Sequence, residues 1–308
     1  MAEHSPVSSC NNEKIKVVST YSGDDEAKYI TQEIQRLKYN DFDYEQMAVL
    51  VRTASQTRAF EECFIKEGIP YKVVGGLKFY ERAEIRDMLA YFRLVLQPSD
   101  DLAFERIINK PARGIGEKTI DKFRNRAKAD AIPLYQAMVS MTSEGAFSGK
   151  TKNALENFIN LMTEWRRIMQ AIPLGEFAET IVDESGYMAM LEQDKSVEAP
   201  GRIENIKELI SVMSDEENYP NLAEFLEHVS LVIDNEYNDN ANKVIVSTLH
   251  AAKGLEFDAV FLPGWEEGIF PHQKCLDGDD GGIEEERRLA YVAITRARRL
   301  LYLSLIHI

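Results

Sequence analysis

A single arginine near the end of the chain, Arg296, has the chemistry to bind an anion. The surrounding run, residues 284–303, reads EEERRLAYVAITRARRLLYL and predicts a helix that begins with acidic residues and ends with basic ones. On such a helix Arg296 shares one face with apolar side chains, at the spacing of Leu289, Val292 and Ala293. A guanidinium on a core-facing surface is costly unless an anion meets it. Its partner is therefore either an internal carboxylate, in a structural ion pair, or a bound anion.

A second group of chemically useful side chains lies in residues 244–263, VIVSTLHAAKGLEFDAVFLP. Two β-branched, apolar runs bracket a polar segment, which predicts strand, loop and strand. The polar segment contains His250, Lys253, Gly254 and Glu256. In an open α/β sheet such loops lie at the carboxyl ends of strands, so we expect the imidazole, ammonium and carboxylate groups to be clustered there. The alternative for each of them is loop packing or a solvated surface charge.

These two segments resemble motifs V and VI of the UvrD/PcrA/Rep group of superfamily 1 DNA helicases. The similarity is nearly continuous over residues 248–257 and 285–297, and strings of this length are specific. Three further runs fit the same family: GWEEGIFPH at 264–272, IPYKVVGGLKFYERAEIRD at 69–87 and KPARGIGEKTID at 110–121. The resemblance therefore covers almost the whole chain.

The elements that must position these residues follow two patterns. Residues 16–95 alternate strand-like runs with amphipathic helical ones, a βαβ rhythm that implies a parallel sheet. From about 81 to 240 the pattern is almost wholly helical, and strand-like runs then return. We expect an α/β domain formed by residues 1–80 and 241–308, interrupted by an all-α inserted subdomain at 81–240. By resemblance the α/β part is a RecA-like domain with the P-loop NTPase fold, the second motor domain, which lacks the P-loop.

Composition predicts an ordinary soluble protein with local basic surface. The 308 residues are 44% hydrophobic and carry a net charge of -15, so contact with nucleic acid must come from local patches. One patch, residues 105–130, has a local charge of about +4. Cys10, Cys63 and Cys275 show no metal or redox spacing, which favours a reducing compartment. No signal peptide or long apolar run is present, so we expect a cytoplasmic protein without membrane contact.

By resemblance, four residues form the half of an ATP site that faces another motor domain. Arg296 would be an arginine finger that reaches the γ-phosphate and stabilises the charge that develops as the bond breaks. Glu256 would accept a hydrogen bond from the ribose, and Lys253 and Gly254 would lie near the phosphates. In the family the P-loop and the magnesium carboxylates lie N-terminal to the matched region. We therefore expect ATP and Mg²⁺ to be bound mainly by an N-terminal P-loop motor domain, and the chain to be truncated at both ends.

Two short segments mimic the nucleotide-binding motifs that the resemblance places elsewhere. GAFSGKT, residues 145–151, is one residue short of the P-loop spacing and does not follow a convincing buried strand. IVDE, residues 181–184, looks like a magnesium-binding strand end, but its apolar spacing fits a helix surface better. We predict that both are ordinary helical segments of the insertion.

The resemblance also implies contacts with single-stranded DNA. Arg52 begins RTAS, where the family has an arginine at the DNA backbone, although Ala54 replaces the usual asparagine. His250 would link its loop to the bound strand. His272, at the end of GWEEGIFPH, matches a position near the single strand, and a plain surface histidine is the alternative.

The run RGIGEKT, residues 113–119, resembles the turn of a helix-hairpin-helix motif. Glycine there permits positive φ, and amide groups at the next helix N-terminus can hold a phosphate of duplex DNA without reading its sequence. The residues expected to bind DNA here are Arg113, Gly114, Gly116, Lys118 and Thr119. The alternative is a plain interhelical turn, and Ala112, where relatives often have lysine, would soften the contact.

The sequence therefore predicts the C-terminal motor portion of an ATP-dependent DNA helicase. The resemblance implies ATP hydrolysis coupled to 3′-to-5′ movement on single-stranded DNA and to unwinding of duplex DNA in repair or replication. We expect the isolated chain to hydrolyse no ATP until an N-terminal P-loop domain is supplied. The competing hypothesis is a non-catalytic module, derived from such a helicase, that binds DNA or a protein partner. The helicase subunit of a recombination nuclease complex is disfavoured, because no acidic nuclease segment follows.

Overall fold

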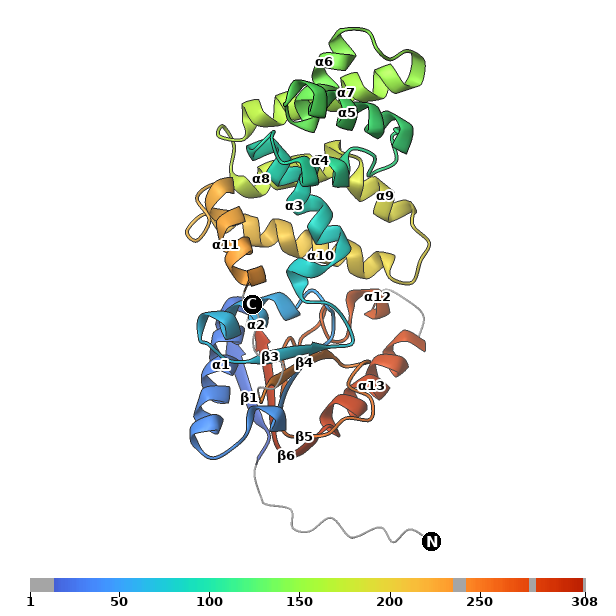
Figure 1. The fold of residues 1–308 in the computed structure, drawn as a ribbon. Helices are drawn as coiled ribbons and strands as arrows, with labels where there is room; N and C mark the ends of the chain where they lie inside the picture. The colour runs from blue at the N-terminus through green and yellow to red at the C-terminus, as the bar shows by residue number, and fades with distance from the viewer. Residues whose placement is uncertain (1–13, 235–241, 277–280, 307–308) are drawn as a thin grey trace, which may run out of the picture. The chain divides into compact units, whose positions relative to one another are not determined.

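The computed structural model describes residues 14–234, 242–276 and 281–306. The chain divides into two compact units, of which the first contains Met1–Phe79 and Asn235–Ile308 and the second contains Tyr80–Asp234 (Figure 1). The N-terminal residues with Cys10 lie outside the described residues. Each unit has its own set of elements and its own buried side chains.

The first unit is built on a parallel six-stranded sheet. Within the described residues the strand order is β1-β6-β5-β2-β4-β3, and every pairing is parallel. The strands are β1 (Lys16–Thr20), β2 (Met47–Val51), β3 (Tyr71–Val74), β4 (Val244–Thr248), β5 (Phe257–Leu262) and β6 (Ala297–Ile306). All five residues of β2 are buried, as expected for a strand with both faces covered. The predicted α/β class with a parallel sheet is confirmed.

Helices cover both faces of this sheet and create two apolar cores. The helices are α1 (Gly23–Tyr39), α2 (Thr57–Lys66), α12 (Gln273–Leu276) and α13 (Gly281–Ile294), with a short 3-10 helix at Tyr44–Gln46. Along β2 the side chains alternate between the cores, because successive strand residues point to opposite faces. Val49 packs with α1 and α2, whereas Leu50 packs in the core to which α13 contributes Leu289 and Ala293. The sheet is therefore held rigidly between two helical layers.

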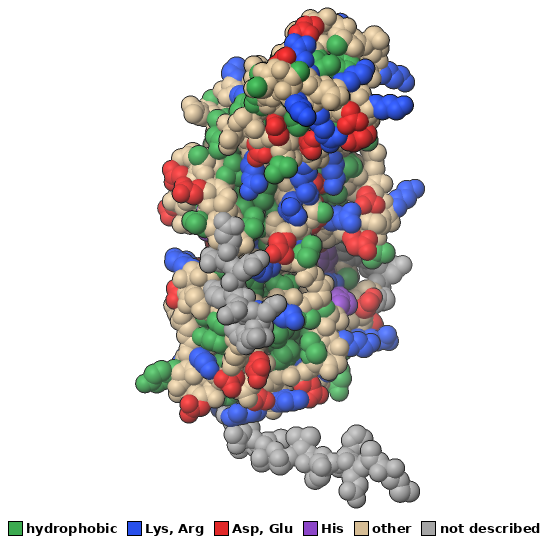
Figure 2. All heavy atoms as spheres, viewed as in Figure 1, with side chains coloured by type: hydrophobic (Ala, Val, Ile, Leu, Met, Phe, Trp, Pro, Cys, Tyr) green, Lys and Arg blue, Asp and Glu red, His purple; other side chains and the backbone are tan. Residues whose placement is uncertain are grey.

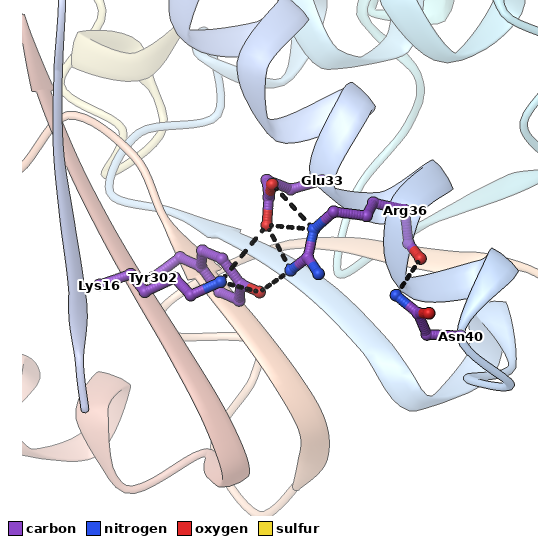
Figure 3. A network of polar contacts seen from close by, with 5 residues as sticks. All are labelled: Lys16, Glu33, Arg36, Asn40 and Tyr302. Atoms are coloured by element: carbon purple, nitrogen blue, oxygen red, sulfur yellow. Dashed lines mark hydrogen bonds and ion pairs between the residues drawn. The ribbon is translucent and has the colours of Figure 1, made fainter. Parts of the chain in front are cut away.

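A polar network fixes the edge of the sheet where β1, β6 and α1 meet (Figure 3). The Tyr302 hydroxyl accepts hydrogen bonds from Lys16 Nζ at 3.3 Å and from Arg36 Nη2 at 3.2 Å, and Arg36 Nη2 also donates to Glu33 at 2.8 Å. The Tyr302 ring stacks on Phe261, with 4.5 Å between the ring centroids. Burial raises the pKa of Tyr302 to about 12, so its hydroxyl stays protonated at neutral pH. The contacts fasten β6 to both of its neighbours and to α1.

Residues 284–303 do not form one continuous helix. Helix α13 ends at Ile294, and β6 begins at Ala297 and pairs with β1 on one side and β5 on the other. The prediction of a helix that continues to 303 was wrong. The apolar run from Leu300 suits a buried strand and a buried helix equally, and the two rows of sheet hydrogen bonds decide between them. Arg296 therefore lies in the connection between helix and strand, not on the helix face.

The second unit is helical throughout its described residues. Its helices are α3 (Ala83–Leu96), α4 (Asp101–Ile107), α5 (Glu117–Asp130), α6 (Leu134–Ser143), α7 (Gly149–Ile168), α8 (Leu174–Glu184), α9 (Tyr187–Gln193), α10 (Ala199–Met213) and α11 (Leu222–Asp234). Helix α3 packs against α4, α7, α8, α10 and α11, and most of its side chains are buried. Tyr91 on α3 meets Trp165 on α7 edge to face, with 6.0 Å between the ring centroids. Helix α3 is thus the central helix of this unit.

The two segments that mimic nucleotide-binding motifs lie among the helices of the second unit. GAFSGKT, residues 145–151, connects α6 to α7 and follows a helix, whereas a P-loop follows a strand. Residues 145–148 of this segment form the connection and only residues 149–151 are helical, so the prediction of a helical segment was only partly right. IVDE, residues 181–184, forms the last turn of α8, where Ile181 and Val182 are buried, as predicted.

Candidate functional site

The predicted site residues of the first unit lie at two opposite edges of its sheet. Strands β4 and β5 both run parallel to β2, so the loop 249–256 leaves the carboxyl edge after β4 and enters β5 at the amino edge. The two edges are about 16–20 Å apart, at about 3.3 Å per residue. His250 therefore lies at one edge and Glu256 at the other. The prediction that the imidazole and the carboxylate are clustered was wrong, because a connection between parallel strands must cross the sheet.

At the amino edge, Arg296 is held by three uncharged oxygens. Its Nε donates to the Val292 carbonyl at 2.9 Å, its Nη1 to the Leu255 carbonyl at 2.8 Å and its Nη2 to the Thr295 hydroxyl at 3.1 Å. Over residues 14–234, 242–276 and 281–306, no carboxylate pairs with this guanidinium. The internal ion pair, which was one of two alternatives, is therefore absent from the described chain. Three of the five guanidinium N–H donors are used, so two remain for an anion.

Glu256 lies beside Arg296 at the same edge. The amide of Phe257, the next residue, donates to the Arg296 carbonyl at 2.9 Å, which fixes the two loops to each other. The Glu256 carboxylate is half-exposed and accepts a hydrogen bond from Arg298 Nε at 3.2 Å. Arg298 was not predicted as a site residue. The edge thus presents two cations and one accessible carboxylate, a set suited to a polyanion that also carries hydroxyl groups.

The remaining loop residues are arranged by a turn that begins at His250. The Lys253 amide donates to the His250 carbonyl at 3.4 Å, and both side chains are exposed. Gly254 has a φ of +90°, a conformation that residues with a Cβ rarely adopt. A glycine is therefore required at this position by the backbone alone. Lys253 shares a turn with His250, so it is grouped with the start of the loop.

At the carboxyl edge, Arg52 follows β2 and forms a two-pronged ion pair with Glu286 of α13. Arg52 Nη2 lies 2.6 Å from Glu286 Oε1, and Arg52 Nε lies 3.1 Å from each carboxylate oxygen. The Glu286 side chain is 5% exposed and that of Arg52 is 18% exposed. Burial raises the pKa of Glu286, but the hydrogen bonds and charge of Arg52 outweigh this and leave that pKa below its usual value. The carboxylate is therefore charged at neutral pH.

Glu286 also contacts the segment that contains His272. The His272 amide donates to Glu286 Oε2 at 3.2 Å, and the Cys275 thiol lies 3.8 Å from Oε1. Glu286 thus brings Arg52 and His272, two residues predicted to contact single-stranded DNA, to one carboxylate. Glu286 itself was not predicted. The sequence could have indicated a buried acid here, because Glu286 has the helical spacing that places it on one face with Leu289 and Ala293, and all three are buried in α13.

The chain next to Arg52 is ordered by a nearby glutamine. Gln56 Oε1 accepts hydrogen bonds from the amides of Arg52 and Thr53, both at 2.9 Å. These two amides lie just beyond the sheet, where the strand ladder no longer supplies acceptors. Gln56 therefore fixes the backbone from which the Arg52 side chain extends.

In the second unit, the glycine turn leads directly into α5. Gly114 has a φ of +73°, and Gly116 is the N-cap of α5, with no side-chain cap. The side chain of Asn109 accepts hydrogen bonds from the amides of Arg113 at 2.8 Å and Ile115 at 3.2 Å. Lys118 is exposed in the first turn of α5, beside Thr119. The helix therefore begins with amides that no protein side chain caps, next to an exposed ammonium group.

The Arg113 side chain turns toward the interior of the unit. Its Nη1 donates to the carbonyls of Ile107, Ile108 and Pro111 at 2.8, 3.3 and 3.3 Å, and its Nη2 donates to the Tyr91 hydroxyl. The hydrogen bonds of this guanidinium are therefore used to connect parts of the second unit. A phosphate at the turn would therefore be bound by the backbone and by Lys118, without the Arg113 side chain.

The basic patch at residues 105–130 is narrower in the structure than its composition implies. Arg124 pairs with three carboxylates and Arg126 with two, which leaves them little free charge. Figure 2 shows the same mixing of basic and acidic side chains over the helices in its upper part. Within the described chain, Lys118, Lys122 and Lys128 are the exposed cations of the patch without an ion pair. Two of these, at 118 and 122, share one face of α5 near the glycine turn.

Comparison with known proteins identifies the family. The profile of the UvrD-like helicase C-terminal domain matches residues 3–307. The chain belongs to this family. It is 45% identical over 301 residues to DNA helicase II of Rickettsia typhi, with 96% of this chain and 45% of the relative covered. ATP-dependent DNA helicase PcrA of Staphylococcus aureus is 40% identical over 303 residues, with 96% and 41% covered. The UvrD-like chain thus spans less than half the length of these relatives.

Three further features bear on ligands of this UvrD-like chain. A groove of about 560 Å³ lies among α4, α5 and α6, and it contains none of the residues predicted to bind nucleotide. In the part of the chain that the structure describes, no three His, Cys, Asp or Glu side chains are close enough to hold a metal ion. No helix within the same ranges is long and apolar enough to cross a lipid bilayer.

Proposed function

We propose that this chain is the C-terminal motor portion of an ATP-dependent DNA helicase that moves 3′ to 5′ on single-stranded DNA and unwinds duplex DNA. The observation that carries the proposal is the setting of Arg296, whose charge is oriented by neutral oxygens and not cancelled by an acid. An arginine that stabilises a transition state must keep its charge available while its geometry is fixed. The names of the similar proteins, which are DNA helicases, support the same assignment.

The amino edge of the sheet would form one wall of the ATP site. Arg296 would place its two unused N–H donors on the γ-phosphate as negative charge develops there. Glu256, whose carboxylate is accessible, would accept a hydrogen bond from the ribose. Lys253 and Gly254 lie earlier in the loop, in the turn that begins at His250, so the phosphate contacts expected of them from the sequence are not part of this proposal. ATP and Mg²⁺ would be bound mainly by a P-loop motor domain supplied from outside this chain. The whole site would thus be completed between two domains.

The carboxyl edge would contact single-stranded DNA, and the second unit would contact duplex DNA. At the edge, Arg52, His250 and His272 follow three neighbouring parallel strands, so a strand of DNA could run across all of them. In the second unit, the backbone at Gly114 and Gly116, with Lys118 and Thr119, would hold a duplex phosphate. Cys63 and Cys275 are free thiols, which is consistent with a protein that functions in a reducing compartment. We propose that this compartment is the cytoplasm.

The test joins this chain to the preceding portion of the Rickettsia typhi relative and measures ATP hydrolysis with and without single-stranded DNA. We expect DNA-stimulated hydrolysis in the joined protein and none in the isolated chain. Arg296→Ala should abolish that activity, because the charge on the γ-phosphate is no longer stabilised. Arg287→Ala is the matched control, since Arg287 is an exposed arginine of α13 that pairs with Glu284. Robust hydrolysis by the isolated chain, or a fully active Arg296→Ala protein, would contradict the proposal. DNA binding without hydrolysis in the joined protein would indicate the non-catalytic module.

A further inference from the structure

Helix α13 links the two edges of the sheet, and Glu286 lies near its beginning. From Glu286 to Ile294 the helix advances about 12 Å, at about 1.5 Å per residue. Arg296 follows the helix directly and lies at the amino edge, whereas Glu286 meets Arg52 at the carboxyl edge. One helix therefore has a buried acid near its beginning and leads, two residues after its end, to the proposed arginine finger.

The Glu286 carboxylate has a full set of donors from three other segments. It receives Arg52 from the end of β2, the His272 amide from the loop after β5, and the Cys275 thiol from α12. A carboxylate that is 5% exposed would lose most of its stabilisation if Arg52 moved away to a phosphate. The ion pair is therefore expected to persist when DNA binds.

The ion pair leaves part of Arg52 free. Glu286 occupies Nε and Nη2, while Nη1 has no partner among the described residues. The guanidinium is planar, so fixing one edge of it also fixes the direction of the remaining N–H groups. Arg52 could then donate to a DNA phosphate through Nη1 in a preset direction.

We propose that Glu286 is a positioning residue for single-stranded DNA, which aligns Arg52 and the His272 segment and fastens both to α13, the helix that precedes Arg296. This inference rests on the proposed function. The proposal predicts that Glu286 strengthens DNA binding, whereas its negative charge alone would weaken it. A bare negative charge near the DNA path repels phosphates, so its removal would tighten binding, whereas loss of an alignment weakens binding.

The test is the affinity of the 308-residue chain for a fluorescein-labelled oligo-dT, measured by fluorescence anisotropy at fixed salt. Glu286→Gln should weaken binding about tenfold, the loss expected when one charge-assisted hydrogen bond is misaligned. Glu285→Gln removes the same charge from an exposed neighbour on the same helix and should leave the affinity within about twofold. Unchanged or tighter binding by Glu286→Gln would overturn the proposal.

Two further variants separate positioning from a general effect on folding. Arg52→Lys keeps the charge but lacks the planar fork of N–H groups on two nitrogens that aligns Arg52 on Glu286, so it should also weaken binding about tenfold. Glu286→Gln should cause no further loss when Arg52 is already alanine, because both changes act through one contact. A lysine variant that binds like wild type would reject the assignment even if Glu286→Gln does not fold. Additive losses in the double variant would reject it if Glu286→Gln does fold.

The same variants in the joined protein distinguish this inference from the proposed function. If Arg296→Ala keeps full ATPase activity, the proposed function fails whatever Glu286 does. If Arg296→Ala is inactive but Glu286→Gln requires no more DNA than wild type for half-maximal stimulation, the inference alone fails. We expect an inactive Arg296→Ala protein and about tenfold more DNA needed by Glu286→Gln.

Discussion

The two edges of the sheet each hold one arginine, but the partners of the two guanidinium groups differ in charge. At the amino edge, Arg296 is surrounded by carbonyl and hydroxyl oxygens, and its charge is not compensated by any described acid. At the carboxyl edge, Arg52 is paired with a buried carboxylate at 2.6 Å. The first arrangement leaves the positive charge of Arg296 uncompensated, and the second fixes the orientation of the Arg52 guanidinium. The difference separates a group that would stabilise charge in a reaction from one that would align a polymer.

The largest effect is expected at the amino edge. Arg296→Lys in the joined protein should lower the DNA-stimulated kcat about a thousandfold, because an ammonium group cannot bind three separate oxygens and also reach a phosphate. Steady-state ATPase assays at saturating DNA measure this change. If the kcat of Arg296→Lys lies within tenfold of wild type, a positive charge alone is sufficient at position 296. The proposed difference between the amino edge and the carboxyl edge would then be wrong.

The next effect compares the stability supplied by the two edges. Arg52→Ala leaves Glu286 as a buried, unpaired carboxylate and should lower the free energy of unfolding by about 3–5 kcal/mol. Arg298→Ala removes an arginine from a half-exposed pair with Glu256 and should cost about 0–1 kcal/mol. Urea unfolding of both variants measures the difference. Equal losses would mean that the ion pair at the carboxyl edge is no more buried than the one at the amino edge.

The smallest effect is the pH dependence of the ion pair at the carboxyl edge. The pKa of Glu286 is lowered in the folded state, so its stabilisation is present above the unfolded pKa and is lost as pH falls through the folded pKa. The difference in stability between wild type and Glu286→Gln should therefore narrow as pH falls from 7 toward 3. Urea unfolding midpoints across this range test it, with Glu285→Gln as the control. A constant difference would show that Glu286 keeps one protonation state throughout.

Much of the fold follows from local patterns in the sequence. Apolar β-branched runs such as the one in β2 predict buried strands, and their alternation with amphipathic segments predicts the parallel sheet. The strings at residues 248–257 and 285–297 were sufficient to name the family. Each of these features is a pattern within one short segment of the sequence.

The errors concern features that depend on distant parts of the chain. The end of α13 is set by the pairing of β6 with two strands, so the apolar run after Arg296 could not reveal it. The crossing of the loop before Glu256 depends on the direction of β5 relative to β4. The ion pair between Arg52 and Glu286 joins residues 234 positions apart, and no local pattern specifies such a partner. Sequence reasoning therefore identified the family and the fold class and missed these internal contacts.

The order of strands has a consequence for synthesis on the ribosome. In the described sheet, β1 pairs with β6 alone, and β2 lies between β4 and β5, so the early strands have their neighbours at the far end of the chain. The helices of the second unit emerge between them and can complete their own core first. Strands β2 and β3 must wait for their partners until translation has passed β4 and β5, and β1 must wait until it has passed β6, which makes that interval the time when a chaperone would be most useful.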